Sequence, residues 1–264
     1  MFSLFRGTTP AIRNGTSRSI AALVSMRLGG VVQWLTLRGH DVANPPLLYV
    51  HGGPGGPDLG AMRRFVPELE EHFVVVRWSQ RGAGKSYARE RGNGKAVAQL
   101  EALGEPRDGA FASVDGTLVQ RRWMRALGMV TFEPKLAAEI GRAIAMNPEL
   151  TLRGDLWSLF ARVRWNMALL WPEFCRVDLA REIPAVDVPV FFVAGEHDWL
   201  TSPEFARQYL DGLRAPRKAF VPSPRSGHVA CFEEPRRFLE VMLRAKAVCG
   251  PEGSPSNGRA AAQA

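Results

Sequence analysis

The sequence predicts an α/β fold: a mainly parallel sheet, covered by helices on both faces and interrupted by a long helical insert. Two short, continuous apolar runs, PPLLYV at 45–50 and HFVVVRW at 72–78, are typical of strands buried on both faces. A third run of this kind, VPVFFVAG, occupies 188–195. Helical apolar spacing separates these runs, and strands that alternate with helices indicate a parallel sheet.

The elements follow in a consistent order. VVQWLTLRG at 31–39 alternates like a strand, and MRRFVPELEEHF at 62–73 has the spacing of one helix between the first two buried strands. After the run at 188–195, the chain predicts a helix, a short strand and a final helix. These three are SPEFARQYLDGL, RKAFVP and EEPRRFLEVMLRAKAV.

Residues 95–180 have a different character, because amphipathic helical patterns follow one another there without an intervening strand pattern. The expected organisation is therefore a core of two pieces around an all-helical cap, with flexible termini. The predicted boundaries are 19–94 and 181–248 for the core, 95–180 for the cap, and 1–18 and 249–264 for the termini.

Length and composition restrict the class of protein. The 264 residues, 46% of them hydrophobic, suffice for one well-buried domain. The net charge is +8 and arginine supplies most of the positive charge, but no basic run with interleaved aromatic residues appears, so nucleic acid is not an expected partner. No stretch reaches the ~18 consecutive apolar residues of a membrane span.

The cysteines and histidines predict neither a disulfide framework nor a metal site. The three cysteines are widely spaced and form no CxxC pair, and the five histidines show no ligand spacing. We therefore expect no cofactor or metal. The N-terminal segment contains arginines and no acid, but its apolar run IAALV is too short for a secretory signal, so we expect a cytoplasmic protein.

The stretch GAGKS at 82–86 follows a predicted strand and resembles part of a phosphate-binding loop. Such a loop needs a further glycine at position 79, where this chain has Ser79. Nucleotide binding is therefore an alternative that matches only part of the motif.

Three other places carry residues suited to acyl-transfer chemistry. HGGPGG at 51–56 follows a buried strand, and glycines there allow backbone N–H groups to approach a substrate. Asp198 comes just after the strand at 188–195, and His228 follows the next strand, in the order of the acid and base of a Ser–Asp–His triad. The simpler alternatives are a Gly/Pro turn, a capping aspartate and a surface histidine.

Taken together, these segments resemble the α/β-hydrolase superfamily, and within it the proline iminopeptidase-like serine peptidases. The resemblance spans most of 26–244, and the helical insert lies where that family carries its cap. The matching segments are LGGVVQWLTLRG, LLYVHGGPGG, SQRGAGKS, VPVFFVAGEHDWLTSPEFARQYLDGLRAP and SGHVACFEEPRRF.

The resemblance implies roles for individual residues. Asp198 matches the triad acid, His228 the triad base, and Gly53 a backbone donor of the oxyanion hole. The implied activity is removal of an N-terminal residue, typically proline, from a small peptide, or hydrolysis of an ester. One departure is visible, because the family usually has aspartate where this chain has Ser79.

The nucleophile elbow Gly-x-Ser-x-Gly is absent from the sequence. No serine has glycine at both −2 and +2, and none follows a buried strand and opens a helix. The candidates that fail are Ser86, Ser113, Ser158 and Ser226. In the resembling family the elbow lies between the QRGxGxS loop and the cap, so about two βα units of ~30 residues each would be missing. The expected fold is thus an α/β-hydrolase-like sheet reduced by loss of central strands.

This absence leaves three interpretations. A different serine, such as Ser86, replaces the nucleophile; or the chain is a non-catalytic relative that binds a peptide or a protein; or it is an inactive product of a deletion that still carries the acid and the base. Loss of a central strand also exposes sheet edges, which predicts self-association through them.

Overall fold

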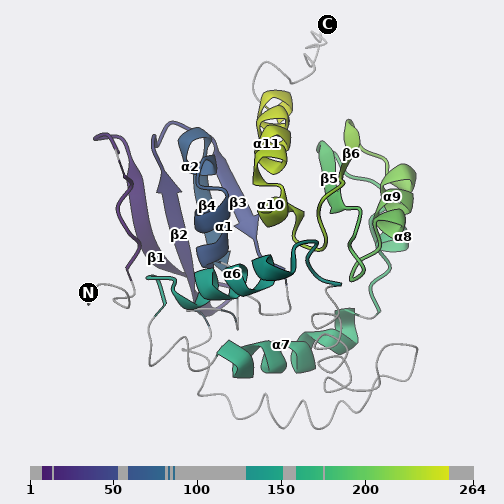
Figure 1. Cartoon of the computed structure of the whole chain (residues 1–264), viewed down its shortest axis with the longest axis horizontal. Coiled ribbons are helices and arrows are strands. Elements are labelled where there is room, and N and C mark those ends of the chain that lie inside the picture. Colours follow the sequence, from purple (N-terminus) through teal and green to yellow (C-terminus); the bar gives the residue numbers. More distant parts are fainter. Residues whose placement is uncertain are drawn as a thin grey trace, which may run out of the picture.

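The computed structural model describes most of the predicted core and part of the predicted cap (Figure 1). The residues described are 8–13, 15–52, 59–80, 83, 86, 129–150, 159–174 and 176–249.

A four-stranded sheet forms the N-terminal half of the core, in the order β1-β2-β4-β3. The strands are β1 (Ile20–Leu28), β2 (Val31–Gly39), β3 (Pro46–Val50) and β4 (Val74–Ser79). β1 and β2 form a hairpin through Gly29 and Gly30, whose φ angles of 56° and 84° suit the tight turn that antiparallel strands require. β2 pairs antiparallel with β4, and β3 pairs parallel with β4.

The segment predicted as one helix at 62–73 forms two short helices, α1 (Leu59–Phe65) and α2 (Leu69–His72). The prediction of a single helix was wrong because it passed over Pro67, which lacks an amide hydrogen and interrupts the helical hydrogen bonds. Both helices still contribute to the core. Their buried side chains, together with residues from β4 and α10, form the main apolar cluster: Ala61, Met62, Val66, Leu69, Phe73, Val75 and Phe232.

A separate, two-stranded sheet forms the C-terminal half of the core. β5 (Val190–Gly195) and β6 (Lys218–Ser223) pair in parallel, and α9 (Pro203–Gly212) connects them. α10 (Ala230–Glu233) and α11 (Pro235–Cys249) follow. In Figure 1, α11 stands between the two sheets, and its apolar side packs on the cluster around α1.

Within the described part of 95–180, every regular element is a helix: α6 (Pro134–Ala145), α7 (Leu159–Phe174) and the start of α8 (Leu179–Glu182). α6 crosses α1 closely, because a Cβ atom placed on Gly60 would lie 2.3 Å from the carbonyl oxygen of Ala143. The sequence also predicts helices at 95–104 and 116–128, and both ranges lie outside the described residues. No helix among the described residues is both long and apolar enough to cross a membrane.

The prediction of an α/β fold is confirmed, with two differences in the sheet. The parallel arrangement holds for β3–β4 and β5–β6, whereas β1–β2 and β2–β4 are antiparallel. The strands also form two sheets rather than one, so β3 and β5 each have a hydrogen-bonded neighbour on one side within the described part of the chain. On β3, Leu48 and Val50 are 55% and 53% exposed.

Candidate active site

Asp198 lies in the turn directly after β5, where several donors converge on its carboxylate. Oδ1 accepts hydrogen bonds from the backbone N–H groups of Leu200 (2.8 Å) and Thr201 (2.9 Å). Oδ2 accepts one from the Thr201 hydroxyl at 2.6 Å. The carboxylate therefore stabilises its own turn, in agreement with the interpretation of Asp198 as a capping residue. The same hydrogen bonds also fix the direction in which Oδ2 points.

His228 meets the same carboxylate from the loop after β6. Its Nδ1 lies 3.0 Å from Asp198 Oδ2, and the side chains are 36% and 8% exposed, respectively. An ionised carboxylate can only accept, so the proton is assigned to Nδ1 and Nε2 carries the lone pair. No group among the described residues hydrogen-bonds to Nε2. Nε2 of this partly exposed ring can therefore take a proton from a reactant.

The electrostatics of Asp198 favour its ionised form. Burial by itself would raise the pKa of Asp198, but hydrogen bonds from His228 and Thr201 outweigh burial and lower the pKa. A carboxylate that stays ionised beside an imidazole holds the ring orientation and stabilises the imidazolium formed after proton uptake.

Two neighbouring glutamates position the histidine loop. Glu233 Oε2 accepts the N–H of Gly227 at 2.6 Å, and Glu234 Oε2 accepts the Ser226 hydroxyl at 2.8 Å and the N–H of Arg225 at 3.0 Å. Sequence reasoning missed this function, although two adjacent acids just before the proline of the last helix were a visible signal. The loop also lies against β5, because a Cβ atom on Gly195 would be 2.1 Å from the Gly227 carbonyl oxygen.

An irregular stretch of the predicted cap, just before α6, is attached to the same loop by one backbone hydrogen bond. The N–H of His228 donates to the carbonyl of Val130 at 2.9 Å, and the Phe132 ring lies 4.8 Å from the His197 ring. The predicted insert therefore contacts both loops, the one that carries Asp198 and the one that carries His228.

The predicted oxyanion donor, Gly53, lies outside the described residues. Its neighbour His51 is described and is 6% exposed, and its carbonyl accepts a hydrogen bond from the Gln80 side chain at 2.9 Å. This contact joins the end of β3 to the end of β4.

Of the four serines considered as nucleophiles, the two with a described position are held in other interactions. Ser86 is 1% exposed; its hydroxyl donates to the carbonyl of Ser79 at 2.5 Å and accepts from the N–H of Trp34 at 3.0 Å. Ser226 is fully buried and donates to Glu234. Ser113 and Ser158 lie outside the described residues. Within the described part, the hydroxyl of Thr201, 3.3 Å from Nδ1, is the side-chain hydroxyl in contact with the His228 ring.

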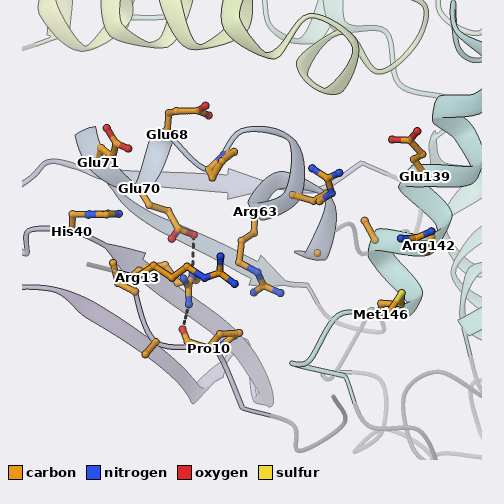
Figure 2. A pocket seen from close by; sticks show the side chains of 17 residues that line it. Pro10, Arg13, His40, Arg63, Glu68, Glu70, Glu71, Glu139, Arg142 and Met146 are labelled. Atoms are coloured by element: carbon orange, nitrogen blue, oxygen red, sulfur yellow. Dashed lines mark hydrogen bonds and ion pairs between the residues drawn. The ribbon is translucent and has the colours of Figure 1, made fainter. Parts of the chain in front are cut away.

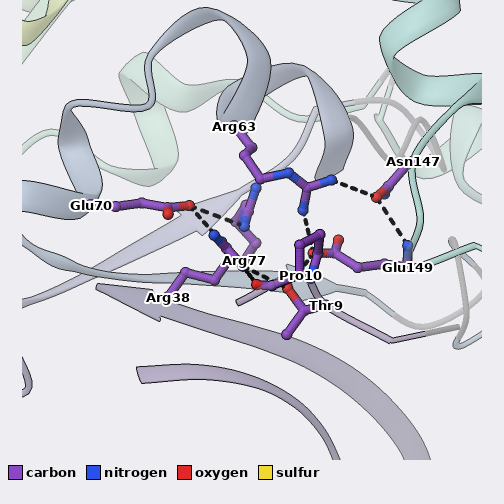
Figure 3. Close-up of polar contacts among 8 residues, drawn as sticks. All are labelled: Thr9, Pro10, Arg38, Arg63, Glu70, Arg77, Asn147 and Glu149. Atoms are coloured by element: carbon purple, nitrogen blue, oxygen red, sulfur yellow. Dashed lines mark hydrogen bonds and ion pairs between the residues drawn. The ribbon is translucent and has the colours of Figure 1, made fainter. Parts of the chain in front are cut away.

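The glutamates in the described part of the predicted cap differ in their surroundings. Glu133, Glu139 and Glu173 are exposed, whereas Glu149 is fully buried. Figure 3 shows Glu149 in a polar cluster, where Arg63 Nη1 lies 2.6 Å from Oε1. Glu149 therefore has a structural partner. We call this group the buried cluster; its charged members are Arg38, Arg63, Glu70, Arg77 and Glu149.

Comparison with known proteins agrees with the architecture. No protein-family model matches the chain. Among curated proteins, it is similar to the probable aminopeptidase YbaC of Bacillus subtilis (strain 168), with 24% identity over 307 residues, covering 86% of this chain and 96% of that protein.

Solved structures of α/β hydrolases superpose on the chain at low sequence identity. A serine hydrolase involved in carbazole degradation, the CarC enzyme, has a TM-score of 0.58 and 17% identity, covering 87% of this chain and all of that one. The enol-lactonase of Burkholderia xenovorans LB400 has a TM-score of 0.54 and 16% identity, covering 85% and 100%. Together with the β–α order and the Asp198–His228 pair, these similarities show that the chain has an α/β-hydrolase fold in a reduced form.

Proposed function

We propose that this chain is a relative of proline iminopeptidase-like serine hydrolases that retains the acid and base of the catalytic site but not its nucleophile. The observation that carries the proposal is the 3.0 Å contact between Asp198 and His228 in a chain whose sequence contains no Gly-x-Ser-x-Gly. Accordingly, we expect it to be inactive, or strongly impaired, in acyl-enzyme hydrolysis.

The extent of the similarity to the probable aminopeptidase supports an internal gap. The match covers 86% of 264 residues, which is about 227, yet it extends over 307 positions, so about 80 positions (307 minus 227) have no residue from this chain. That total exceeds by about 20 positions the ~60 residues of the two βα units missing from the predicted order, so it leaves room for both. Division of the strands into two sheets is in keeping with a lost central segment.

The chemical consequence follows from the function of the nucleophile. In the subtilisin triad, loss of the serine alone lowers kcat by about 10⁶, nearly as much as loss of all three residues. Half of the oxyanion hole is the N–H after the nucleophile, so the same segment would supply that donor. Ser86 does not compensate, because its O–H donates to the Ser79 carbonyl rather than to a histidine and the side chain is buried.

A turnover assay tests this proposal. N-terminal prolyl and alanyl arylamides and a short-chain aryl ester would be incubated with the purified chain and with a His228→Ala variant prepared in parallel. We expect equal, background rates for both proteins. Turnover that the His228→Ala variant lacks would show that a working nucleophile exists and would refute the proposal.

The alternative function is binding without catalysis, with a peptide or a protein as the partner. Its specific support is the pair of exposed aromatic side chains near the site: Trp199, next to Asp198, is 68% exposed, and Phe205 on α9 is 72% exposed. Calorimetric titration with short unblocked peptides tests this alternative. A saturable change that is lost in Trp199→Ala and Phe205→Ala would favour it, and no change would exclude it for those peptides.

A further inference from the structure

A cavity of about 910 Å³ lies away from the Asp198–His228 pair, and its lining contains no residue from either of those loops. It is bordered by the N-terminal segment, the end of β2, helices α1 and α2, and α6 (Figure 2). Nine of the lining residues are arginines or glutamates, whereas ligand pockets in general carry only a few polar groups. The cavity therefore needs an explanation separate from the proposed hydrolase site.

The crossing of α1 and α6 gathers arginines on one side of this cavity. Gly60 brings α1 against the backbone of Ala143. Arg63 and Arg64 follow Gly60 by about one helical turn, and Arg142 directly precedes Ala143. Because both helices approach at this point, three guanidinium groups from two elements border the same space.

Arg63 is held in place before any ligand arrives. Its Nη1 donates to Glu149 at 2.6 Å, and its Nη2 donates to Asn147 at 3.1 Å. A guanidinium has five N–H donors, so part of its hydrogen-bonding capacity is left for the cavity. The Arg63 side chain is 20% exposed, whereas its partner Glu149 is fully buried. Because these contacts already hold the guanidinium in place, ligand binding costs little additional side-chain entropy at Arg63.

The two flanking arginines lack an acidic partner among the described residues. Neither Arg64 nor Arg142 forms an ion pair there; Arg64 lies over the Phe65 ring, 5.7 Å from its centre. Four glutamates also line the cavity. Glu70 is paired with Arg38, and Figure 2 shows Glu68 and Glu71 on the opposite side of Arg63 from Arg142. Glu139 therefore remains as the one lining carboxylate near this arginine group.

We propose that this cavity binds a small molecule through an oxyanion group, of the phosphate or carboxylate type, held by Arg63, Arg64 and Arg142. Arginine guanidinium groups bind such oxyanions with paired, charge-assisted hydrogen bonds. The site is independent of the acid–base pair, so it exists whether or not the chain hydrolyses peptides.

Titration with inorganic phosphate and, separately, with citrate at constant ionic strength tests the proposal by calorimetry and by the rise in melting temperature. We expect saturable binding that weakens about tenfold in an Arg64→Ala/Arg142→Ala double variant, because each substitution removes charge-assisted hydrogen bonds. Glu139→Gln should strengthen binding, since it removes a negative charge beside the ligand. The phosphate and citrate arms distinguish a tetrahedral from a carboxylate ligand.

Arg207→Ala is the matched control. Arg207 is an arginine on α9 whose guanidinium lies 4.1 Å from the centre of the Phe220 ring, and it does not line the cavity. Its loss should leave binding unchanged. Two results would overturn the proposal: no saturable binding of either anion to folded protein, or equal binding in the Arg64→Ala/Arg142→Ala variant and the Arg207→Ala control.

Discussion

Glu149 provides the sharpest test of how the segment after α6 is held against the N-terminal half of the core. It is fully buried at the end of the segment after α6, and its Oε1 accepts hydrogen bonds from Arg63 on α1 (2.6 Å) and from Thr9 (2.8 Å). Burial alone would raise the pKa of Glu149, but the charges of Arg77 and Arg63 and the hydrogen bonds outweigh burial and lower it. Glu149 is therefore ionised in the folded protein at neutral pH.

The Glu149→Gln substitution keeps the shape of the side chain and removes its charge. Arg77, which is 1% exposed, then remains in the interior with less compensating negative charge. Removing one partner of a buried ion pair costs about 3–5 kcal/mol in the free energy of unfolding. Since 1 kcal/mol corresponds to about 2–4 °C in a domain of this size, the melting temperature should fall by about 6–20 °C.

Urea denaturation followed by circular dichroism measures this change as a lower midpoint with an unchanged slope. The control is Arg18→Ala, which breaks an ion pair with Asp41 whose side chains are 60% and 39% exposed, and which should cost less than about 1 kcal/mol. If Glu149→Gln is as stable as Arg18→Ala, the charge on Glu149 contributes nothing to stability and the argument from the buried cluster is wrong.

Four further predictions concern the candidate site, the helix crossing and the sheet edge. The pKa of Asp198 is lowered in the folded protein, so ionised Asp198 stabilises the fold fully above the ordinary carboxyl pKa of about 3.9. This stabilisation is lost as the pH falls through the lowered pKa of the folded protein. The urea midpoint should therefore decrease more on acidification in the wild type than in Asp198→Asn. Glu233→Gln should weaken the acceptor of the Gly227 amide, and hydrogen exchange at that amide should accelerate, while unchanged protection would contradict the positioning function. Gly60→Ala should destabilise the chain by about 1–3 kcal/mol in urea, since the new methyl group meets the Ala143 carbonyl; a neutral result would mean that α1 and α6 do not cross as described. Leu48→Lys should reduce concentration-dependent self-association in sedimentation velocity, because a lysine on an exposed edge strand opposes pairing, and a monomeric wild type would contradict the expectation.

The sequence predicted those features that depend on local pattern and on chain order. The sequence places both Asp198 and His228 after strands. Because β5 and β6 are parallel neighbours, both strands end at the same edge of the sheet, and the two side chains meet in the loops that follow. The helices α9 and α11 likewise follow from their apolar periodicity and their starting prolines.

Features that depend on long-range contacts could not be predicted. Arg63 and Glu149 are 86 positions apart, and nothing in either local pattern identifies the other as its partner. The cavity arginines were invisible for the same reason, since they meet only where Gly60 lets two helices touch. The antiparallel pairing of β1 and β2, by contrast, could have been predicted from the Gly-Gly turn between them, had that signal been used.

Fluorophosphonate labelling tests most directly the claim that no activated serine nucleophile accompanies Asp198 and His228. The purified chain, shown to be folded by circular dichroism, would be treated before and after heat denaturation, and its peptides analysed by mass spectrometry. We predict no labelling that depends on the native fold. A single serine labelled in the native protein and unlabelled after denaturation or in His228→Ala would identify an activated nucleophile and contradict the account.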